Sequence, residues 1–139
     1  MKFIVEAIPQ GKARARTFYD QRARKMRSIT PEKTRDYESL VRWSYKAGGG
    51  QYYGDKLISV DIKAYYPIPK SYSQKKKAGC IEGKERPAKK PDLDNCAKAI
   101  LDALNGVAWH DDSQVVCLSV NKYYAERGYV EVDITPLDL

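Results

Sequence analysis

The sequence predicts a protein of the α/β (α+β) class, in which two main helices pack against a mixed β-sheet. Two segments repeat apolar residues at helical spacing, and four shorter segments alternate or concentrate apolar residues as strands do. The length of 139 residues suits one hydrophobic core. Because neither an internal repeat nor a second core is visible, we expect residues 1–139 to form a single domain.

The first third of the chain is expected to contain a strand at 2–8 and a helix at about 30–46. Residues 20–28 are basic and show no periodicity, which predicts a mobile loop or arm. Pro31 suits the first position of the helix, and Glu32 suits its first turn. The inner face of this helix is expected to comprise Tyr37, Leu40, Val41, Ser44 and Tyr45.

Three further strands and one helix are expected in the second half. Residues 56–66 alternate between apolar and polar, which indicates a strand with one buried face. Strands at 115–124 and 129–135, separated by a turn at 126–128, are expected to pair as a β-hairpin. The helix spans about 92–105, and its expected buried stripe comprises Leu93, Ala97, Ile100, Leu101 and Leu104.

Residues 70–90 form a lysine-rich stretch that is long for a loop in a compact domain. The stretch could contain a short helix, but no residue type in it repeats at a helical period. We therefore expect a basic loop or insert with a functional role.

The charges are strongly segregated along the chain. The net charge is +7 overall, with +6 in residues 1–29, +1 in 30–69, +6 in 70–90 and −6 in 91–139. Two basic blocks beside one acidic block favour a polyanionic partner and a site that must neutralise part of that partner's charge.

Several cations in the basic blocks are candidates for contacts with nucleic acid. In an extended chain, cations at every second position from residue 12 to residue 16 would lie on one side. Such a row could follow a phosphate backbone, or it could be the solvated face of an edge strand. The candidates are Lys12, Arg14, Arg16, Lys75, Lys76, Lys77, Lys89 and Lys90.

The cysteines and the single histidine argue against a zinc site or a disulfide framework. Cys80, Cys96 and Cys117 are widely spaced, and His110 has no second histidine to join it. Cys96 and Cys117 fall within apolar patterns, so we expect both to be buried. Any metal here would therefore be held by oxygen ligands.

No apolar run approaches the roughly 18–20 residues of a membrane span. The first residues also contain no long apolar region of the kind found in signal peptides. We expect a cytoplasmic protein without a membrane partner.

Acidic residues cluster at both ends of the helix expected at 92–105. Asp92 and Asp94 stand at its start, and Asp111 and Asp112 follow its end. A chain reversal could bring Asp112 near Asp92 and Asp94, where three carboxylates would repel one another unless a cation lay among them. Mg²⁺ prefers such hard oxygen ligands. The alternative is that Asp92 and Asp94 only cap the helix.

Lys98 lies one helical turn after Asp94. It could bind a phosphate and stabilise the charge that develops in a transition state. Alternatively, it could form a simple ion pair on the helix surface. Trp109, next to the second acidic pair, is expected to anchor the core.

These motifs together resemble the RusA family of Holliday junction resolvases. The combination is much more specific than an isolated pair of aspartates, and weaker similarity extends over most of the chain. The residues that carry the resemblance are Lys90-Pro91-Asp92-Leu93-Asp94-Asn95, Lys98-Ala99, the segment from Leu101 to Gly106, and the segment from Trp109 to Val116.

The resemblance implies a homodimeric, Mg²⁺-dependent endodeoxyribonuclease, in which Mn²⁺ can substitute. Such an enzyme hydrolyses phosphodiesters in four-way DNA junctions during recombination and repair, and the family is common in prophages. The resemblance also implies that Asp92, Asp94 and Asp112 hold the metal, that Lys98 is essential for cleavage and that Asp111 supports them. A dimer with two-fold symmetry suits a junction that must be cut twice.

Two other functions are compatible with the same residues. One is a less selective metal nuclease that acts on branched DNA. The other is a non-catalytic nucleic-acid-binding module, in which the aspartates only cap a helix. Comparing the cleavage of a junction with that of a linear duplex separates these possibilities.

Overall fold

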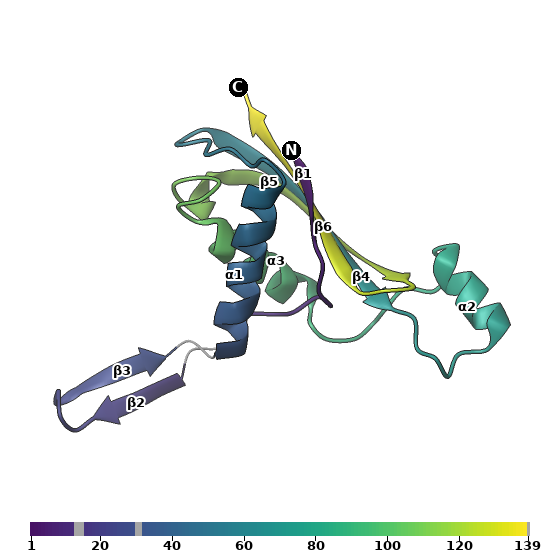
Figure 1. Ribbon diagram of the computed structural model, residues 1–139, viewed down its shortest axis with the longest axis horizontal. Helices are drawn as coiled ribbons and strands as arrows, with labels where there is room; N and C mark the ends of the chain where they lie inside the picture. The colour runs from purple at the N-terminus through teal and green to yellow at the C-terminus, as the bar shows by residue number, and fades with distance from the viewer. Residues whose placement is uncertain (13–15, 30–31, 139) are drawn as a thin grey trace.

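A four-stranded mixed β-sheet forms the centre of the molecule in the computed structural model, which describes residues 1–12, 16–29 and 32–138 (Figure 1). The strand order is β1-β6-β4-β5, and β4 runs parallel to β5 and antiparallel to β6. This arrangement confirms the predicted mixed sheet. The strands are β1 (Lys2–Val5), β4 (Leu57–Pro67), β5 (Val115–Ala125) and β6 (Tyr129–Leu137).

Helices α1 (Glu32–Ala47) and α3 (Leu93–Leu104) lie on the same side of this sheet (Figure 1). Alternate residues of β4 point into the core beneath them, and Ile58, Ile62 and Ala64 are fully buried. The predicted helix positions are confirmed to within a few residues. On α3, however, Leu93 is 41% exposed, so the buried stripe begins at Cys96 rather than at Leu93.

The pairing of the last two strands differs from the predicted hairpin. Strands β5 and β6 follow one another, but β4 lies between them and pairs with both. Val132 and Ile134 of β6 are fully buried, whereas Leu118 of β5 is 47% exposed. Burial therefore favours β4 and β6 at the centre and the more polar β5 at the edge, a choice that the short turn between β5 and β6 does not reveal.

The basic segment predicted as a mobile loop is instead part of a β-hairpin formed by β2 (Arg16–Asp20) and β3 (Lys25–Ile29). An Asp20 carboxylate oxygen accepts hydrogen bonds from the backbone N–H groups of Arg22 and Ala23, at 3.0 and 3.2 Å. The other oxygen pairs with Arg27 Nε at 2.6 Å. Local hydrogen bonds thus close the turn, although the segment lacks the alternation of apolar residues that would predict two strands.

The lysine-rich stretch contains the short helix α2 (Gln74–Ile81), which lies beyond the end of β4 (Figure 1). Ser73 caps its start by accepting a hydrogen bond from the Lys76 N–H at 3.2 Å. After the helix, the Arg86 guanidinium stacks 4.2 Å from the Tyr123 ring centre and donates to the Lys122 carbonyl at 2.6 Å. These contacts attach residues 70–90 to the sheet.

The cysteine prediction is half right. Cys96 is 3% exposed, as expected, but Cys117 is exposed because it lies on the edge strand β5. The predicted strand at 2–8 ends at Val5. Among the described helices, none has the length and apolar character needed to cross a membrane.

Candidate active site

The start of α3 is held against the sheet by backbone and buried side chains rather than by its aspartates. The Tyr66 hydroxyl donates to the Pro91 carbonyl at 2.9 Å, and the Cys96 thiol packs beside both groups. Asp92 occupies the N-cap position, yet in the described part of the chain its side chain makes no capping hydrogen bond. The exposed carboxylates of Asp92 and Asp94 are therefore available for a ligand.

A close backbone approach places Lys12 against α3. A Cβ at Gly11 would meet Pro91 Cβ at 2.9 Å and Asn95 Cβ at 3.2 Å, so only glycine fits this crossing without a shift. The next residue, Lys12, donates its N–H to the Asn95 carbonyl at 3.4 Å. The segment after β1 is thus brought to the acidic face of the helix.

Lys12 connects two acidic residues on different helices. Its ammonium nitrogen lies 2.6 Å from Glu38 Oε1 on α1 and 3.2 Å from Asp102 Oδ2 on α3. Burial alone would lower the pKa of Lys12, but hydrogen bonds and charge from Glu38 and Asp102 raise it overall. This partly buried lysine is therefore charged at neutral pH and already paired with protein carboxylates.

Asp102 also meets Asp112, which the chain reversal after α3 returns to the helix. The pKa of Asp112 is raised by partial burial, then by the charge of Asp111, and then by the charge and a side-chain hydrogen bond of Asp102. Two carboxylates in such contact disfavour double ionisation. Lys12 offsets part of that repulsion through its ion pair with Asp102.

Trp109 anchors the chain reversal in the core. Its side chain is fully buried, and its ring N–H donates to Asn105 Oδ1 at 2.9 Å. Gly106 has φ 75° and donates its N–H to the Trp109 carbonyl at 2.7 Å, which closes the turn in a conformation that favours glycine. The prediction of Trp109 as a core anchor is confirmed.

The next residues lock the acidic turn onto the start of β4. Gln114 Nε2 donates to the carbonyls of Gly54 and Lys56 at 2.7 and 2.8 Å. The pKa of Asp111 is lowered chiefly by a hydrogen bond from the Ser113 side chain and then by the hydrogen bond that Asp111 accepts from the Ser113 N–H. Asp111 therefore has a structural role as the cap of a short 3₁₀ turn, Asp112–Gln114.

Lys98 projects into solvent between Asp94 and Asp102 on α3. Within the described residues, no ion pair of 4 Å or less joins Lys98 to either acid. The alternative of a simple surface ion pair thus has no support in this geometry. The ammonium group is available for an anionic ligand.

The structure does not gather all the predicted metal ligands. Among residues 1–12, 16–29 and 32–138, no three His, Cys, Asp or Glu side chains converge as a metal site. Asp112 contacts Asp102, while Asp92 and Asp94 lie at the opposite end of the same helix. The donors themselves fit a hard cation, since all are carboxylates in a solvent-accessible position.

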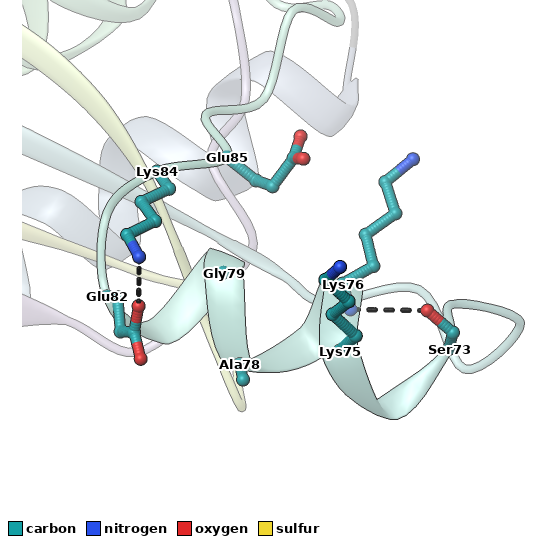
Figure 2. A pocket seen from close by; sticks show the side chains of 8 residues that line it. All are labelled: Ser73, Lys75, Lys76, Ala78, Gly79, Glu82, Lys84 and Glu85. Carbon is teal, nitrogen blue, oxygen red and sulfur yellow. Dashed lines mark hydrogen bonds and ion pairs between the residues drawn. The ribbon is translucent and has the colours of Figure 1, made fainter.

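The candidate DNA-binding lysines differ in their surroundings. Lys75 and Lys76 are exposed on α2, beside a hollow that Glu82 and Glu85 also line (Figure 2). Lys77 is half-buried on the same helix. Of the N-terminal cations, Lys12 is paired as described, Arg14 lies outside the described residues, and the Arg16 side chain also lies outside them.

Lys89 and Lys90 are exposed immediately before the acidic helix start. The Lys89 ammonium lies 5.4 Å from the Tyr124 ring centre. Lys122 donates to the Lys89 carbonyl at 2.6 Å, so the backbone of this segment is held on the sheet. A cationic surface therefore adjoins Asp92.

Glu38 and Asp102 belong to this site, although neither was among the predicted site residues. The spacing of Asp94, Lys98 and Asp102 already predicts that they share one line along the helix, and this pattern is the signal for Asp102. Glu38 carries no comparable signal. Its position depends on how α1 crosses α3, which no local pattern specifies.

Comparison with known proteins identifies the class. The family described as "Endodeoxyribonuclease RusA" matches residues 6–135 of the chain. The chain therefore belongs to the RusA endodeoxyribonuclease family. It is also 51% identical over 79 residues to the "Uncharacterized protein YqaN" of Bacillus subtilis (strain 168). That alignment covers 55% of this chain and 56% of the relative, so the chain spans little more than half of the relative's length.

The Asp102–Asp112 contact predicts an unusual gain in stability on substitution. The pKa of Asp112 is higher in the folded protein than in the unfolded chain. Its favourable contribution to folding stability is therefore complete below the pKa of the unfolded chain and is lost as pH rises through the pKa of the folded protein. At pH 7 in EDTA, we expect Asp112→Asn to raise the thermal midpoint by roughly 1–3 °C. Near pH 3, the difference should vanish.

Asp111→Asn is the matched control for this prediction. The pKa of Asp111 is lowered, so its stabilising contribution is present above its unfolded pKa and disappears at low pH. This substitution should lower the midpoint at pH 7. A fall in the midpoint of Asp112→Asn at pH 7 would show instead that its carboxylate makes a net stabilising contact.

Proposed function

We propose that the protein is a Mg²⁺-dependent endodeoxyribonuclease that resolves four-way DNA junctions by paired phosphodiester hydrolysis. The observation that carries this proposal is the exposed face of α3 in a member of the RusA family. Asp92 and Asp94 make no capping or ion-pair contact within the described residues, and Lys98 lies one turn away. A helix that used these acids only as caps would engage Asp92 in a hydrogen bond.

Asp92, Asp94 and Asp112 are the proposed metal ligands, with Asp92 and Asp94 at the start of α3 and Asp112 beside Asp102 near its other end. A single ion bound by all three would require these two ends of the site to approach one another. Mg²⁺, or Mn²⁺ in its place, would supply an activated water and would polarise the scissile phosphate. The preference of such a cation for oxygen ligands fits these carboxylates. The repulsion between Asp102 and Asp112 favours binding of a cation at the end of α3 where these two residues meet.

The remaining residues of the site have distinct roles in the proposal. Lys98 neutralises the charge that develops on the phosphate during hydrolysis. Lys89 and Lys90 hold the DNA backbone next to the acidic helix start, where unbalanced carboxylates would otherwise repel it. Lys12 has a different task, because it holds Asp102 and Glu38 in place.

The proposal includes a homodimer, because a four-way junction requires two matched cuts. Strand β5 supports it. Among the described residues, β5 pairs only with β4, and its free edge exposes Val116 at 50% and Leu118 at 47%. Lys122 is the one charged residue of this eleven-residue strand. A long edge with exposed apolar side chains and little charge is suited to pairing with another strand, here the β5 of a second copy.

Leu118→Lys tests this dimer. A buried charge at the paired edge should shift the protein from dimer to monomer in sedimentation equilibrium. Ile4→Lys is the control, because Ile4 is 42% exposed on β1, at the edge of the sheet opposite β5. A monomeric wild-type protein would contradict the homodimer, and a dimer that survives Leu118→Lys would place the interface elsewhere.

The function itself is tested by incubating the protein with Mg²⁺ and either a synthetic four-way junction or a linear duplex of the same sequence. Paired, symmetric nicks in the junction alone are the expected result. Equal cleavage of flaps and junctions would indicate the less selective nuclease. Binding without cleavage, over a broad range of pH and junction sequence, would leave a nucleic-acid-binding module. The proposed setting is the cytoplasm of a bacterial or phage-infected cell, in recombination and repair.

A further inference from the structure

The β2–β3 hairpin presents an unusual exposed apolar surface. Tyr19 and Met26 are directly opposite one another across the two strands, and they are 55% and 60% exposed. Their strand neighbours on this face, Thr17 and Ser28, are small and also exposed. On the other face, Phe18 is 41% exposed. The hairpin thus keeps an aromatic ring and a flexible thioether in solvent, away from the core.

The hairpin projects from the body of the molecule rather than packing on it (Figure 1). Its turn is closed by the two hydrogen bonds to Asp20 and by the ion pair of Asp20 with Arg27 at 2.6 Å. The backbone of Arg24 takes a φ of 51°, which completes the reversal. Tyr19 and Met26 are therefore displayed on a defined two-stranded ribbon whose registry is set next to the turn.

The charge of the hairpin selects its partner. Residues 16–29 contain five cations and one acid. Arg22, Arg24 and Lys25 are exposed at the turn, next to the Tyr19–Met26 pair. Cations that surround exposed aromatic and apolar side chains are typical of surfaces that hold a phosphate backbone while stacking on bases. The hairpin of a second copy would meet this surface with the same positive charge, so DNA is the better match.

We propose that the Tyr19–Met26 pair stacks on bases at the branch point of a DNA junction. The base faces of an intact duplex are covered by their neighbours, whereas the strand exchange at a branch point interrupts this stacking. At such a step, apolar side chains can enter between the bases at a smaller cost in stacking free energy. The turn arginines would hold the adjoining phosphates. This inference rests on the proposed function for its DNA substrate and adds the residues that select a branched form of it.

Tyr19→Ala is the main test, and binding is measured without Mg²⁺ so that cleavage plays no part. The probe is a synthetic four-way junction with 2-aminopurine at the branch point, compared with a linear duplex. For Tyr19→Ala we expect about tenfold weaker binding to the junction and little change in binding to the duplex. The change in 2-aminopurine fluorescence on binding should also be smaller than with the wild-type protein. Met26→Ala should act in the same direction, and Tyr19→Trp should retain binding because it keeps the stacking surface.

Tyr52→Ala is the matched control, since Tyr52 is also 55% exposed but lies outside the hairpin. Equal loss of junction and duplex binding in Tyr19→Ala would overturn the branch-point assignment. Unchanged DNA binding together with loss of the dimer would instead assign the pair to a second copy of the chain. A protein that binds junctions through Tyr19 but never cleaves them would retain this inference and refute the nuclease.

Discussion

Asp94→Asn is expected to reduce junction cleavage on the order of a thousandfold. The substitution keeps the size and planar shape of the side chain, but it replaces one carboxylate oxygen with an NH₂ donor and removes the charge that would bind Mg²⁺. Because Asp94 is exposed in the first turn of α3, the fold should change little. Single-turnover cleavage of a four-way junction, measured at saturating protein, separates this chemical defect from weaker binding.

Junction binding provides the contrast for this prediction. Removing a negative charge from a surface that meets DNA should leave binding unchanged or slightly stronger. Asp36→Asn is the control, since Asp36 is an exposed acid on α1 outside the candidate site. Full cleavage by Asp94→Asn would reduce the role of this residue to favouring the helix start.

Trp109→Ala is expected to lower the free energy of unfolding by about 3–5 kcal/mol. The side chain is fully buried, and its loss would leave a large cavity beneath α3. The substitution would also leave the Asn105 side chain without the ring N–H that it accepts at 2.9 Å. Urea unfolding followed by circular dichroism measures the effect without relying on tryptophan fluorescence.

Trp43→Ala is the control, because it removes the same side chain from an exposed position. Trp43 is 68% exposed on α1, so Trp43→Ala should change the free energy of unfolding by about 0.5 kcal/mol or less. Comparable losses for the two variants would mean that Trp109 is not the anchor of the core. If Trp109→Ala remains folded, a disproportionate loss of cleavage would show that this anchor also positions Asp112.

Local patterns were sufficient for the elements whose burial follows directly from their own sequence. The alternation at 56–66 and the stripe at 92–105 each produce one apolar face, and both elements form as predicted. The position of Asp92 and Asp94 at a helix start was equally local. The β2–β3 hairpin was missed because Asp20, Arg27 and the turn backbone stabilise it, rather than an apolar alternation.

The sequence by itself determined the chemistry available to this protein: carboxylates at both ends of one helix, a lysine between them and cations around them. Only the tertiary structure decided which of these groups meet. The insertion of β4 between β5 and β6 follows from competition among strands for burial. The contacts of Asp102 with Lys12 and Asp112 follow from the crossing at Gly11 and the turn anchored by Trp109. Both depend on residues far apart in the chain, whose distances no local periodicity encodes.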